Sequence, residues 1–349
     1  MTEQQTLTPP TPLSTLTKEV DQPAPLEDQE KKSPLRFSSL VRSVACWFDN
    51  STKKYSEAET DNQYSIDWLR MIPYVGMHVM CLGVIWVGWS PVAVAVAAAL
   101  YTFHMFVITG FYHRYFSHRT FKTSRAAQFI FAVAGASCVQ RGAIWWAARH
   151  RHHHRHSDKE DDIHSPIRHG FYWSHVGWIV SKAGFDYDAK AVPDLMKYPE
   201  LRFLNRFDNL VPIIEAVMIF FLGVFLESLG WNTSGMQMLI WGFFISTICS
   251  SHATFTINSL THMIGKKRYK SKDESRNSLL LALLTFGEGW HNNHHYYPGA
   301  VRQGFYWWEI DLTYYGLWLL SRLGIIWDLT PVPPDVRESH KVSAAGSAS

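Results

Sequence analysis

Two long apolar segments without a charged side chain constrain this chain more than any other feature. Residues 71–89 and 91–112 form runs of 19 and 22 residues that contain no Lys, Arg, Asp or Glu. A helix of about 20 apolar residues crosses the ~30 Å hydrocarbon core of a bilayer. Because Ser90 alone separates the two runs, they predict a tight hairpin of two transmembrane helices.

A second apolar pair follows later in the chain. Residues 211–229 hold Glu215 and Glu227 near their ends, and residues 236–257 hold no Lys, Arg, Asp or Glu. Charged residues make up only 18% of the chain and aromatic residues 15%, a composition that is unusual for a soluble domain. The expected fold is therefore an all-α integral membrane protein with four transmembrane helices in two hairpins.

The distribution of Lys and Arg predicts how these helices are oriented. These residues number 8 before Met71, 15 from residue 113 to 210 and 10 after residue 257, and the short connections within the hairpins hold none. Basic residues collect on the cytoplasmic side of membranes. We therefore expect a multi-pass protein with both termini on the cytoplasmic side.

The two ends of the chain differ in composition from its middle. The first ~60 residues are rich in Thr, Pro, Glu, Gln and Ser, and such a segment buries too little apolar surface to order itself. We expect residues 1–65 to be a disordered cytoplasmic tail, 66–330 to be the membrane domain and 331–349 to be a disordered C-terminal tail.

Histidine clusters are the second constraint on the chain. They read HRYFSH at 113–118, HRHHH at 150–154 and HNNHH at 291–295, and His262 lies between the last two. Neutral imidazole binds borderline transition metals without adding charge. So many imidazoles suggest two metal ions rather than one, and the charge distribution places every cluster on the cytoplasmic side.

The spacing within the clusters predicts which imidazoles project together. The first, fourth and fifth residues of HRHHH and of HNNHH share one face of an α-helix. His113 and His118 are five residues apart, which lies off a shared face of an α-helix. We expect this pair to straddle the end of the second transmembrane helix.

Each cluster also has a simpler interpretation. The run at 149–156 could be a basic, metal-scavenging tract of low complexity, and the pair at 113 and 118 could lie at the membrane interface without binding metal. The cluster at 291–295 favours a metal site, because Trp290 and residues 296–298 surround it with bulky side chains. Three clusters in one chain together favour metal binding.

The order and flanks of the clusters resemble those of the membrane-bound fatty acyl desaturases of the acyl-CoA Δ9, stearoyl-CoA desaturase-like type. GFYHRYFSHRTFK at 110–122, WAARHRHHHRHSD at 146–158, GFYWSHVGW at 170–178 and GEGWHNNHHYYP at 287–298 are similar to that family's motifs. The likeness covers roughly residues 68–329. It implies a cytoplasmic helical cap that holds a di-iron site above the four membrane helices.

The resemblance also implies roles for particular residues. Two irons would be held by His113, His118, His150, His153, His154, His262, His291, His294 and His295, with Asn258 reaching one iron through water. Apart from the resemblance, we expect His175 and Asp158 to hydrogen-bond to ligands, with a solvated acidic turn as the alternative for Asp158. The acyl chain would lie in a tunnel beside Trp146 and Trp290. From helix rise, not from the resemblance, we expect Ala97 or Tyr101 to limit its closed end, because they lie ~24 and ~18 Å deeper along the second helix than His113.

The implied reaction is an O2-dependent desaturation that inserts a cis double bond, at the Δ9 position by resemblance, into a saturated fatty acyl chain. Removing hydrogen from an unactivated carbon is beyond acid–base chemistry at neutral pH, so the protein would supply position and the irons the oxidising power. One alternative is a di-iron membrane hydroxylase of alkyl or lipid chains. A more distant alternative is a membrane metal-binding or transport protein.

The sequence does not determine two partners, the acyl carrier and the electron donor. Acyl-CoA relatives commonly carry Arg-Asp where this chain has Ala148-Arg149, so the acyl carrier could be CoA, acyl carrier protein or a phospholipid. The sequence shows no haem or dinucleotide motif, so electrons would come from a ferredoxin, a rubredoxin or a cytochrome b5 with its reductase. The basic run 266–272 could receive that donor or anchor the fourth helix to anionic lipid. No nucleic acid is expected as a partner.

Overall fold

The computed structural model of the protein describes residues 44–52 and 64–342. The described ranges therefore include residues 44–52, 64–65 and 331–342 of the two tails that were expected to be disordered, and residues in both tails contact the rest of the chain. Cys46 is buried, and the Trp47 indole donates to the carbonyl of Leu69 at 3.0 Å. At the other end, Tyr269 donates through its hydroxyl to the carbonyl of Arg337 at 2.8 Å. These contacts within 44–52 and 331–342 are not revealed by composition; the disorder expected for residues 1–43, 53–63 and 343–349 lies outside the described residues.

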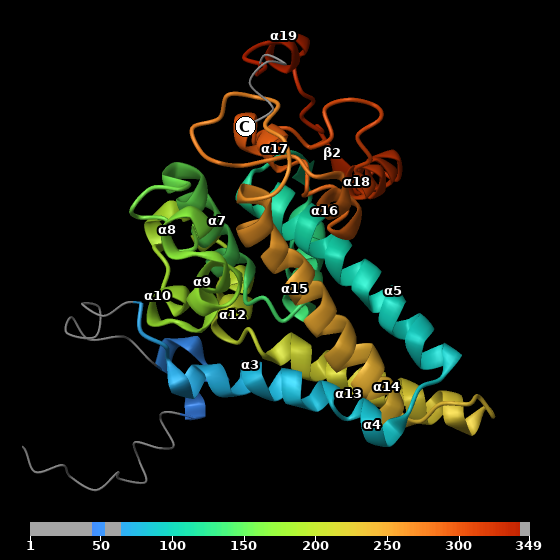
Figure 1. Cartoon of the computed structure of the whole chain (residues 1–349). Coiled ribbons are helices and arrows are strands. Elements are labelled where there is room, and N and C mark those ends of the chain that lie inside the picture. Colours follow the sequence, from blue (N-terminus) through green and yellow to red (C-terminus); the bar gives the residue numbers. More distant parts are fainter. Residues whose placement is uncertain (1–43, 53–63, 343–349) are drawn as a thin grey trace, which may run out of the picture.

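Four helical stretches are long and apolar enough to cross a membrane (Figure 1). They are residues Trp68–Val87, Pro91–Ser117, Leu210–Ser228 and Gly235–His262. Their elements are α3 (Trp68–Cys81) with α4 (Val84–Val87), α5 (Pro91–Val107) with η2 (Ile108–Ser117), α13 (Leu210–Ser228), and α14 (Gly235–Met238) with η5 (Leu239–Ile245), α15 (Ser246–Ser259) and η6 (Leu260–His262). These helices bear out the expectation of a helical membrane protein.

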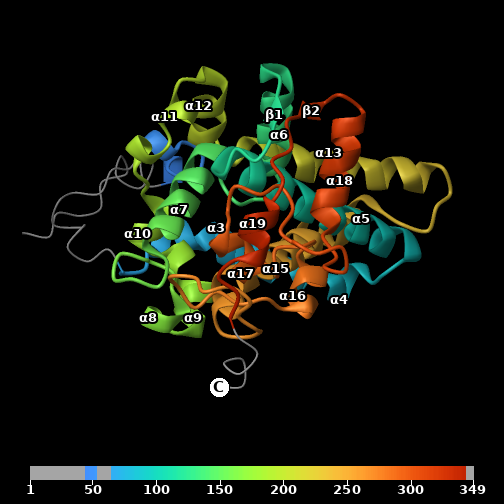
Figure 2. The same ribbon diagram turned by 90° about the horizontal axis from the view of Figure 1, so that it is seen from above.

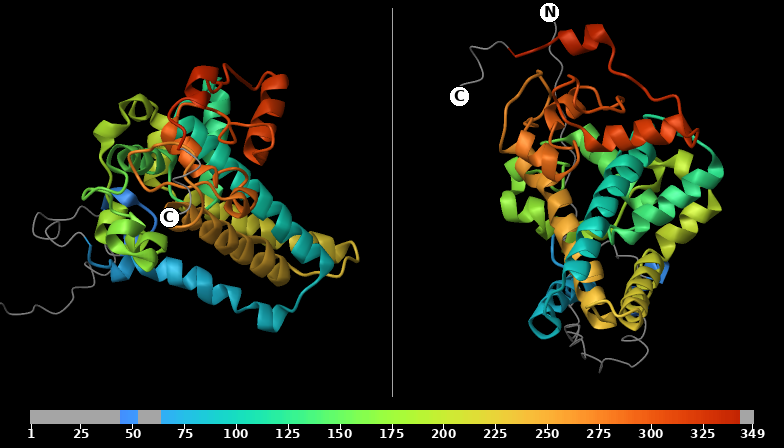
Figure 3. Two further views of the ribbon diagram at one scale, coloured as in Figure 1. Left: turned by 45° about the horizontal axis from the view of Figure 1, so that its top comes forward. Right: turned by 90° about the vertical axis from the view of Figure 1, so that its right-hand side faces the viewer.

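Polar residues define where these helices begin. The Ser90 hydroxyl accepts from the amide of Ala93 and caps α5, whose first residue is a proline, and Ser234 caps α14 in the same way. Ser90 also donates to Gln237 at 2.7 Å, which ties the start of α5 to α14. The connections at 88–90 and 229–234 lie at the same end of the helices, and Figure 3 shows α5 and α15 side by side.

The shorter elements gather mainly at the opposite end (Figures 1 and 2). They are η1 (Asn50–Thr52), β1 (Lys122–Thr123), α6 (Arg125–Ser137), α7 (Ala143–His156), α8 (Pro166–His169), α9 (Phe171–His175), η3 (Gly177–Val180), α10 (Lys182–Phe185), η4 (Ala189–Ala191), α11 (Pro193–Met196), α12 (Pro199–Arg206), α16 (Leu279–Leu284), α17 (His291–Tyr296), α18 (Leu312–Arg322), β2 (Ile326–Trp327) and α19 (Pro334–Glu338). The strands β1 and β2 pair antiparallel. The largest buried apolar cluster joins η2, α7 and α12 through residues such as Tyr112, Ile144 and Leu201.

The segment η2 is a π-helix, and this changes the geometry of the first histidine pair. In a π-helix each amide bonds to the carbonyl five residues earlier, and the amide of His118 accordingly donates to the carbonyl of His113 at 3.3 Å. Residues five apart therefore lie on one face, and the two imidazole centroids are 4.9 Å apart. The expectation that this pair straddles the end of the helix is confirmed, because His113 lies within η2 and His118 is its C-cap; the α-helical geometry on which it was based does not apply to a π-helix.

Candidate metal centre

Four elements bring the clustered imidazoles together. The π-helix η2 and its C-cap supply the first pair, α7 supplies three, the end of η6 supplies one and α17 supplies three. Two sets result: the first imidazole set is His113, His118, His150, His154 and His294, and the second imidazole set is His153, His262, His291 and His295. Within each set the candidate ligand nitrogens all lie within 4.8 Å of one another. Helices α7 and α17 each contribute to both sets, because residues at i, i+3 and i+4 share a face.

The ring nitrogens in the first set point at each other. The Nε2 atoms of His118 and His150 are 2.7 Å apart, and those of His113 and His294 are 3.0 Å apart. The second set has the same arrangement, with 3.1 Å between the Nε2 atoms of His262 and His291. Ring nitrogens that converge in this way share a proton when one of them is protonated, and can share a cation when both present a lone pair.

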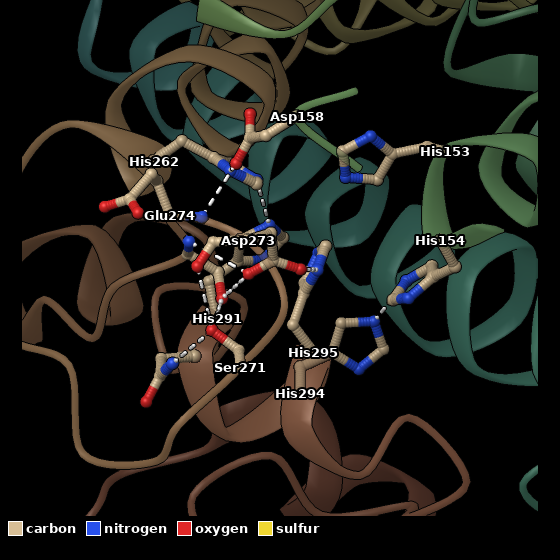
Figure 4. Close-up of polar contacts among 12 residues, drawn as sticks. His153, His154, Asp158, His262, Ser271, Asp273, Glu274, His291, His294 and His295 are labelled. Carbon is tan, nitrogen blue, oxygen red and sulfur yellow. Dashed lines mark hydrogen bonds and ion pairs between the residues drawn. The ribbon is translucent and has the colours of Figure 1, made fainter. Parts of the chain in front are cut away.

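Four carboxylates hold the opposite sides of these rings. Each accepts a hydrogen bond from an Nδ1 atom, which leaves the Nε2 lone pair facing the centre. The pairs are Glu288 with His113 at 2.6 Å, Asp162 with His153 at 3.0 Å, Asp158 with His262 at 2.9 Å and Asp273 with His295 at 2.6 Å. Figure 4 shows Asp158 and Asp273 reaching the imidazoles of the second set.

Burial keeps most of these imidazoles neutral. It lowers the pKa well below the usual value for His118, His150, His154, His291 and His294. It also lowers the pKa of His295 to about 4, although Asp273 opposes the change. For His153, burial is outweighed by the carboxylate of Asp162, which raises the pKa. Neutral rings are the form that binds metal.

The carboxylates remain charged beside these rings. Burial raises the pKa of Asp158, but hydrogen bonds from His262 and Ser165 bring it to about 2. Burial also raises the pKa of Asp273, but its interaction with His295 and a hydrogen bond from Ser275 outweigh burial and bring the pKa below its usual range. The site therefore combines neutral nitrogen ligands with outer negative charge, which suits a divalent or trivalent transition metal.

An orphaned atom gives independent support for metal binding. The Nε2 atom of His295 is buried and has no hydrogen-bond partner among the described residues. Such an atom costs free energy unless something occupies the space before it. The two sets could thus hold a metal ion each.

Residues that the spacing argument did not single out hold this centre in place. Arg114 donates from Nη2 to Glu288 at 3.0 Å and from Nη1 to the carbonyl of Val301 at 2.8 Å, and Gln303 donates to Glu288 at 2.8 Å. Glu288 lies in the GEGWHNNHH motif, and its position next to the histidines could have indicated that it contacts the metal centre. Asp273 lies beside a basic run and gave no such signal.

A cavity of about 690 Å³ reaches the metal centre from the membrane helices. Its lining is mostly apolar and includes Trp146, His150 and Asn258. A second cavity of about 30 Å³ lies beyond, with Thr109 and His291 in its wall. Trp146, His150 and Asn258 line both spaces, and Asn258 lines the smaller one together with His113, His153 and His291.

Three residues expected to line the acyl tunnel are absent from the walls of both cavities. The Tyr101 hydroxyl instead donates to the carbonyl of Leu284 at 2.8 Å, and the Trp290 indole donates to the carbonyl of Ile310 at 2.8 Å. Ala97 is buried elsewhere on α5. Counting residues along a helix predicts depth but not the side on which a residue faces, which is why this expectation differs from the structure.

His175 does not make the expected hydrogen bond to a clustered imidazole. Its Nδ1 lies 3.0 Å from the Ser259 hydroxyl and its Nε2 lies 3.0 Å from Nδ1 of His252. His252 in turn contacts His78 at 3.0 Å, so the three rings link α9, α15 and α3. The sequence motif around His175 placed it near the site but did not reveal these partners.

The two extra histidines of the second cluster lie outside both sets. His152 contacts the carbonyl of Asp161 at 2.9 Å, and His156 lies 3.3 Å from the Asp161 carboxylate. They occupy the opposite face of α7 from the ligands.

Comparison with known proteins agrees with this geometry. The model of the fatty acid desaturase family matches residues 88–327. The chain is 34% identical over 270 residues to an sn-1 stearoyl-lipid 9-desaturase from Anabaena variabilis, covering 76% of this chain and 94% of the relative. It is 37% identical over 257 residues to an sn-1 stearoyl-lipid 9-desaturase from Synechocystis, covering 72% and 76%.

A relative with a different carrier is almost as similar. An acyl-CoA 5-desaturase from Anemone leveillei is 33% identical over 301 residues, covering 83% of this chain and 86% of the relative. The matched family and the two imidazole sets lead to one conclusion: the chain belongs to the fatty acid desaturase family and is an oxidoreductase that desaturates fatty acyl chains.

Proposed function

We propose that the protein holds two iron ions, one in each imidazole set, and uses them with O2 to insert a cis double bond into a saturated acyl chain. The convergence of nine imidazoles beside a long apolar cavity is the observation that supports this proposal. One O2, two electrons and two protons would be consumed with two hydrogen atoms from adjacent carbons, and two waters would leave. The family uses iron, which supplies the oxidising power when bound.

The residues of this chain would supply position. The carboxylates of Glu288, Asp162, Asp158 and Asp273 keep the rings in the ligating tautomer. Asn258 would hold a water at the second set, which has four imidazoles where the first has five. Trp146 would lie beside the acyl carbons next to His150, since its side chain lines both cavities.

The relatives support a substrate esterified to a lipid or to CoA, and two of those described act at position 9. We propose the Δ9 position for this chain on that basis. The four helices would cross the membrane as two hairpins. Both termini and the helical cap would lie on the cytoplasmic side, because the short connections within the hairpins hold no Lys or Arg and basic residues collect on the cytoplasmic side of membranes.

A separate protein would deliver the electrons. Ferredoxin, rubredoxin and cytochrome b5 each fit a basic docking surface. Part of the basic run is already paired: Lys267 lies 2.9 Å from Glu274, and Arg268 pairs with Glu309. Lys266, Lys270 and Lys272 form no ion pair with the described residues and could contact a partner protein or lipid.

Expression in a host that lacks its own desaturase tests the reaction. A fatty acid methyl ester profile with derivatisation should show a new monounsaturated acid, whose bond position tests the Δ9 assignment. His294→Ala should abolish it while the protein remains in the membrane, and His156→Ala should retain it. Activity in His294→Ala would overturn the di-iron assignment, and an oxygenated product would indicate hydroxylation instead.

A further inference from the structure

The large cavity follows one face of the fourth membrane helix toward the metal centre. The residues of α15 in its wall recur every three or four positions, so they share one face of the helix: Thr247, Ile248, Ser251, Thr254, Phe255 and Asn258. This stripe is ~17 Å long, from the rise of an α-helix. Asn258 at its end also lines the small cavity beside the imidazoles. The stripe is therefore a continuous path from the interior of the membrane domain to the metal centre.

Helices α3 and α13 form the sides of this path. Helix α3 contributes Ile72, Gly76 and Met77 to the cavity wall, and α13 contributes Ile213 and Val217. Ile72, Ile213 and Val217 are 52%, 45% and 50% exposed, although they line a cavity. Side chains that both line a cavity and remain half exposed mark the place where it opens. The cavity therefore opens sideways, between two helices that could each cross a membrane.

The N-terminal segment 44–52 crosses the same gap at the end of the helices nearest the metal centre. The Trp47 indole donates to the carbonyl of Leu69 in α3 at 3.0 Å. The side-chain amide of Asn50 donates to the carbonyl of Asn205 in α12 at 3.1 Å. Both Trp47 and Asn50 line the cavity. Among the described residues, this segment bridges the two sides at that end, whereas the half-exposed rims lie farther along α3 and α13.

The opening lies at the depth of acyl chains. Helix α3 begins at Trp68 and α13 at Leu210. The rim residues of α3 lie at most ~14 Å along the helix from its start, and those of α13 at most ~11 Å. The hydrocarbon core is ~30 Å thick, so the opening belongs to the leaflet nearest the metal centre. A lipid in that leaflet could pass one acyl chain sideways while its head group stays at the surface.

The rims present no charge to a passing acyl chain. Glu215 is the one charged residue in the first two turns of α13, and it does not line the cavity; its carboxylate lies 3.1 Å from Nε2 of His104 on α5. On the opposite rim, Gly76 leaves the opening wide, because a Cβ atom there would meet nothing within 4 Å. An apolar chain could therefore enter without removing water from a charged group, which would be costly.

We propose that the acyl chain of a bilayer glycerolipid enters the enzyme sideways, through the opening between α3 and α13. This inference rests on the proposed function and narrows its substrate to a lipid that is already in the membrane. A thioester arriving from water would instead have to enter at the end that segment 44–52 crosses.

Photolabelling tests this route without turnover. The full-length protein is reconstituted in phosphatidylcholine bilayers that contain a phosphatidylcholine with a diazirine on its stearoyl chain. After irradiation, labelled residues are located by mass spectrometry. The wild type should be labelled inside the cavity, at Thr254 or Phe255, and also on Trp86, which is 80% exposed on α4. Labelling of Trp86 serves as the internal reference for contact with bulk lipid.

Variants at the rims then locate the route. Gly76→Phe fills the opening and should reduce labelling inside the cavity about tenfold relative to labelling of Trp86. Val79→Phe is the matched control, because Val79 lies on α3, is 55% exposed and is not part of the cavity wall. If Gly76→Phe does not fold, Val217→Trp narrows the opening from α13, with Met218→Trp, which is 65% exposed and outside the wall, as its control.

Two outcomes would overturn the proposal. One is equal labelling of the cavity by the lipid probe in a rim variant and its control. The other is labelling of the cavity by diazirine-bearing stearoyl-CoA, added in water, in wild type and Gly76→Phe alike, while the lipid probe reaches only the outer surface. Labelling needs neither metal nor O2. A failed double-bond assay with the expected labelling pattern would therefore count against the reaction and leave the entry route standing.

Discussion

At the scale of single residues, the metal centre depends on carboxylates as much as on imidazoles. An imidazole can present either nitrogen, and the proton on Nδ1 decides which one is free. Glu288 and Asp273 each lie 2.6 Å from an Nδ1 atom and so select the ligating tautomer. Neither residue would touch the metal, yet each determines whether its histidine can.

Asp273→Asn tests this dependence. The amide keeps the size of the side chain but removes the charge that orients His295, so metal affinity at the second imidazole set should fall about 10–100-fold. Iron content after dialysis against a graded chelator measures the change. Asp161→Asn is the control, because its carboxylate is exposed and contacts only residues outside both sets. Equal iron retention in the two variants would contradict the role given to Asp273.

At the scale of elements, the π-helix η2 is the feature that places His113 and His118 on one face, so that both can belong to the first imidazole set. It is held by close packing: Tyr112 is fully buried, and a Cβ atom at Gly135 of α6 would lie 2.0 Å from its ring. A glycine is therefore needed at this crossing, since no side chain fits between α6 and η2.

Gly135→Ala should consequently lower stability by about 1–3 kcal/mol, as overpacking does in other cores, and should loosen the adjacent His113. Thermal unfolding and iron content measure the two effects. Gly76→Ala in α3 is the matched control, because a Cβ atom there meets nothing within 4 Å. A Gly135→Ala protein as stable as this control would show that η2 can shift without cost.

At the scale of the whole molecule, an ion-pair group joins the elements around the metal centre. Asp194 of α11 lies 2.7 Å from Arg151 of α7 and 2.8 Å from Arg119, which follows η2. Burial raises the pKa of Asp194, but hydrogen bonds from Arg151 and Arg119 outweigh it and bring the pKa to about 2. The folded pKa is thus lower than the unfolded value of about 4.

A lowered pKa means that this group stabilises the fold above about pH 4 and loses that contribution between pH 4 and pH 2. Because the side chain is 34% exposed, the contribution is about 1 kcal/mol after screening. Asp194→Asn should therefore be less stable than wild type at pH 6, with the difference disappearing near pH 2. Thermal unfolding of metal-free protein measures it, and Asp328→Asn, which is exposed, is the control. A difference independent of pH would contradict the ion-pair explanation.

Metal removal should also affect the whole molecule. The two imidazole sets join α7, α17, η2 and η6, so bound ions cross-link elements that are distant in sequence. Chelation should lower the unfolding temperature of wild-type protein by several degrees and have a smaller effect on His294→Ala, whose first imidazole set lacks one ligand. An unchanged wild-type unfolding temperature would show that the elements around the two imidazole sets are held together by packing alone.

The sequence predicted the parts of this molecule that depend on local periodicity. The apolar runs predicted the four long helices, and the i, i+3, i+4 spacing predicted which residues of α7 and α17 would project together. It could not predict the π-helix that aligns His113 with His118, because hydrogen-bond register is not visible in spacing. It also could not predict Asp273 or the cavity wall, since these depend on how distant segments pack.

Helices α7 and α17 each contribute imidazoles to both sets, and this has a consequence for how the centre assembles. The first ion to bind would also align the imidazoles of α7 and α17 that belong to the other set. The second ion would therefore bind with a smaller loss of conformational entropy. Loading should then be cooperative, and protein with a single ion should be scarce at any metal concentration. The cell would contain a population divided between empty and complete enzyme, with few half-assembled centres able to react with O2 unproductively.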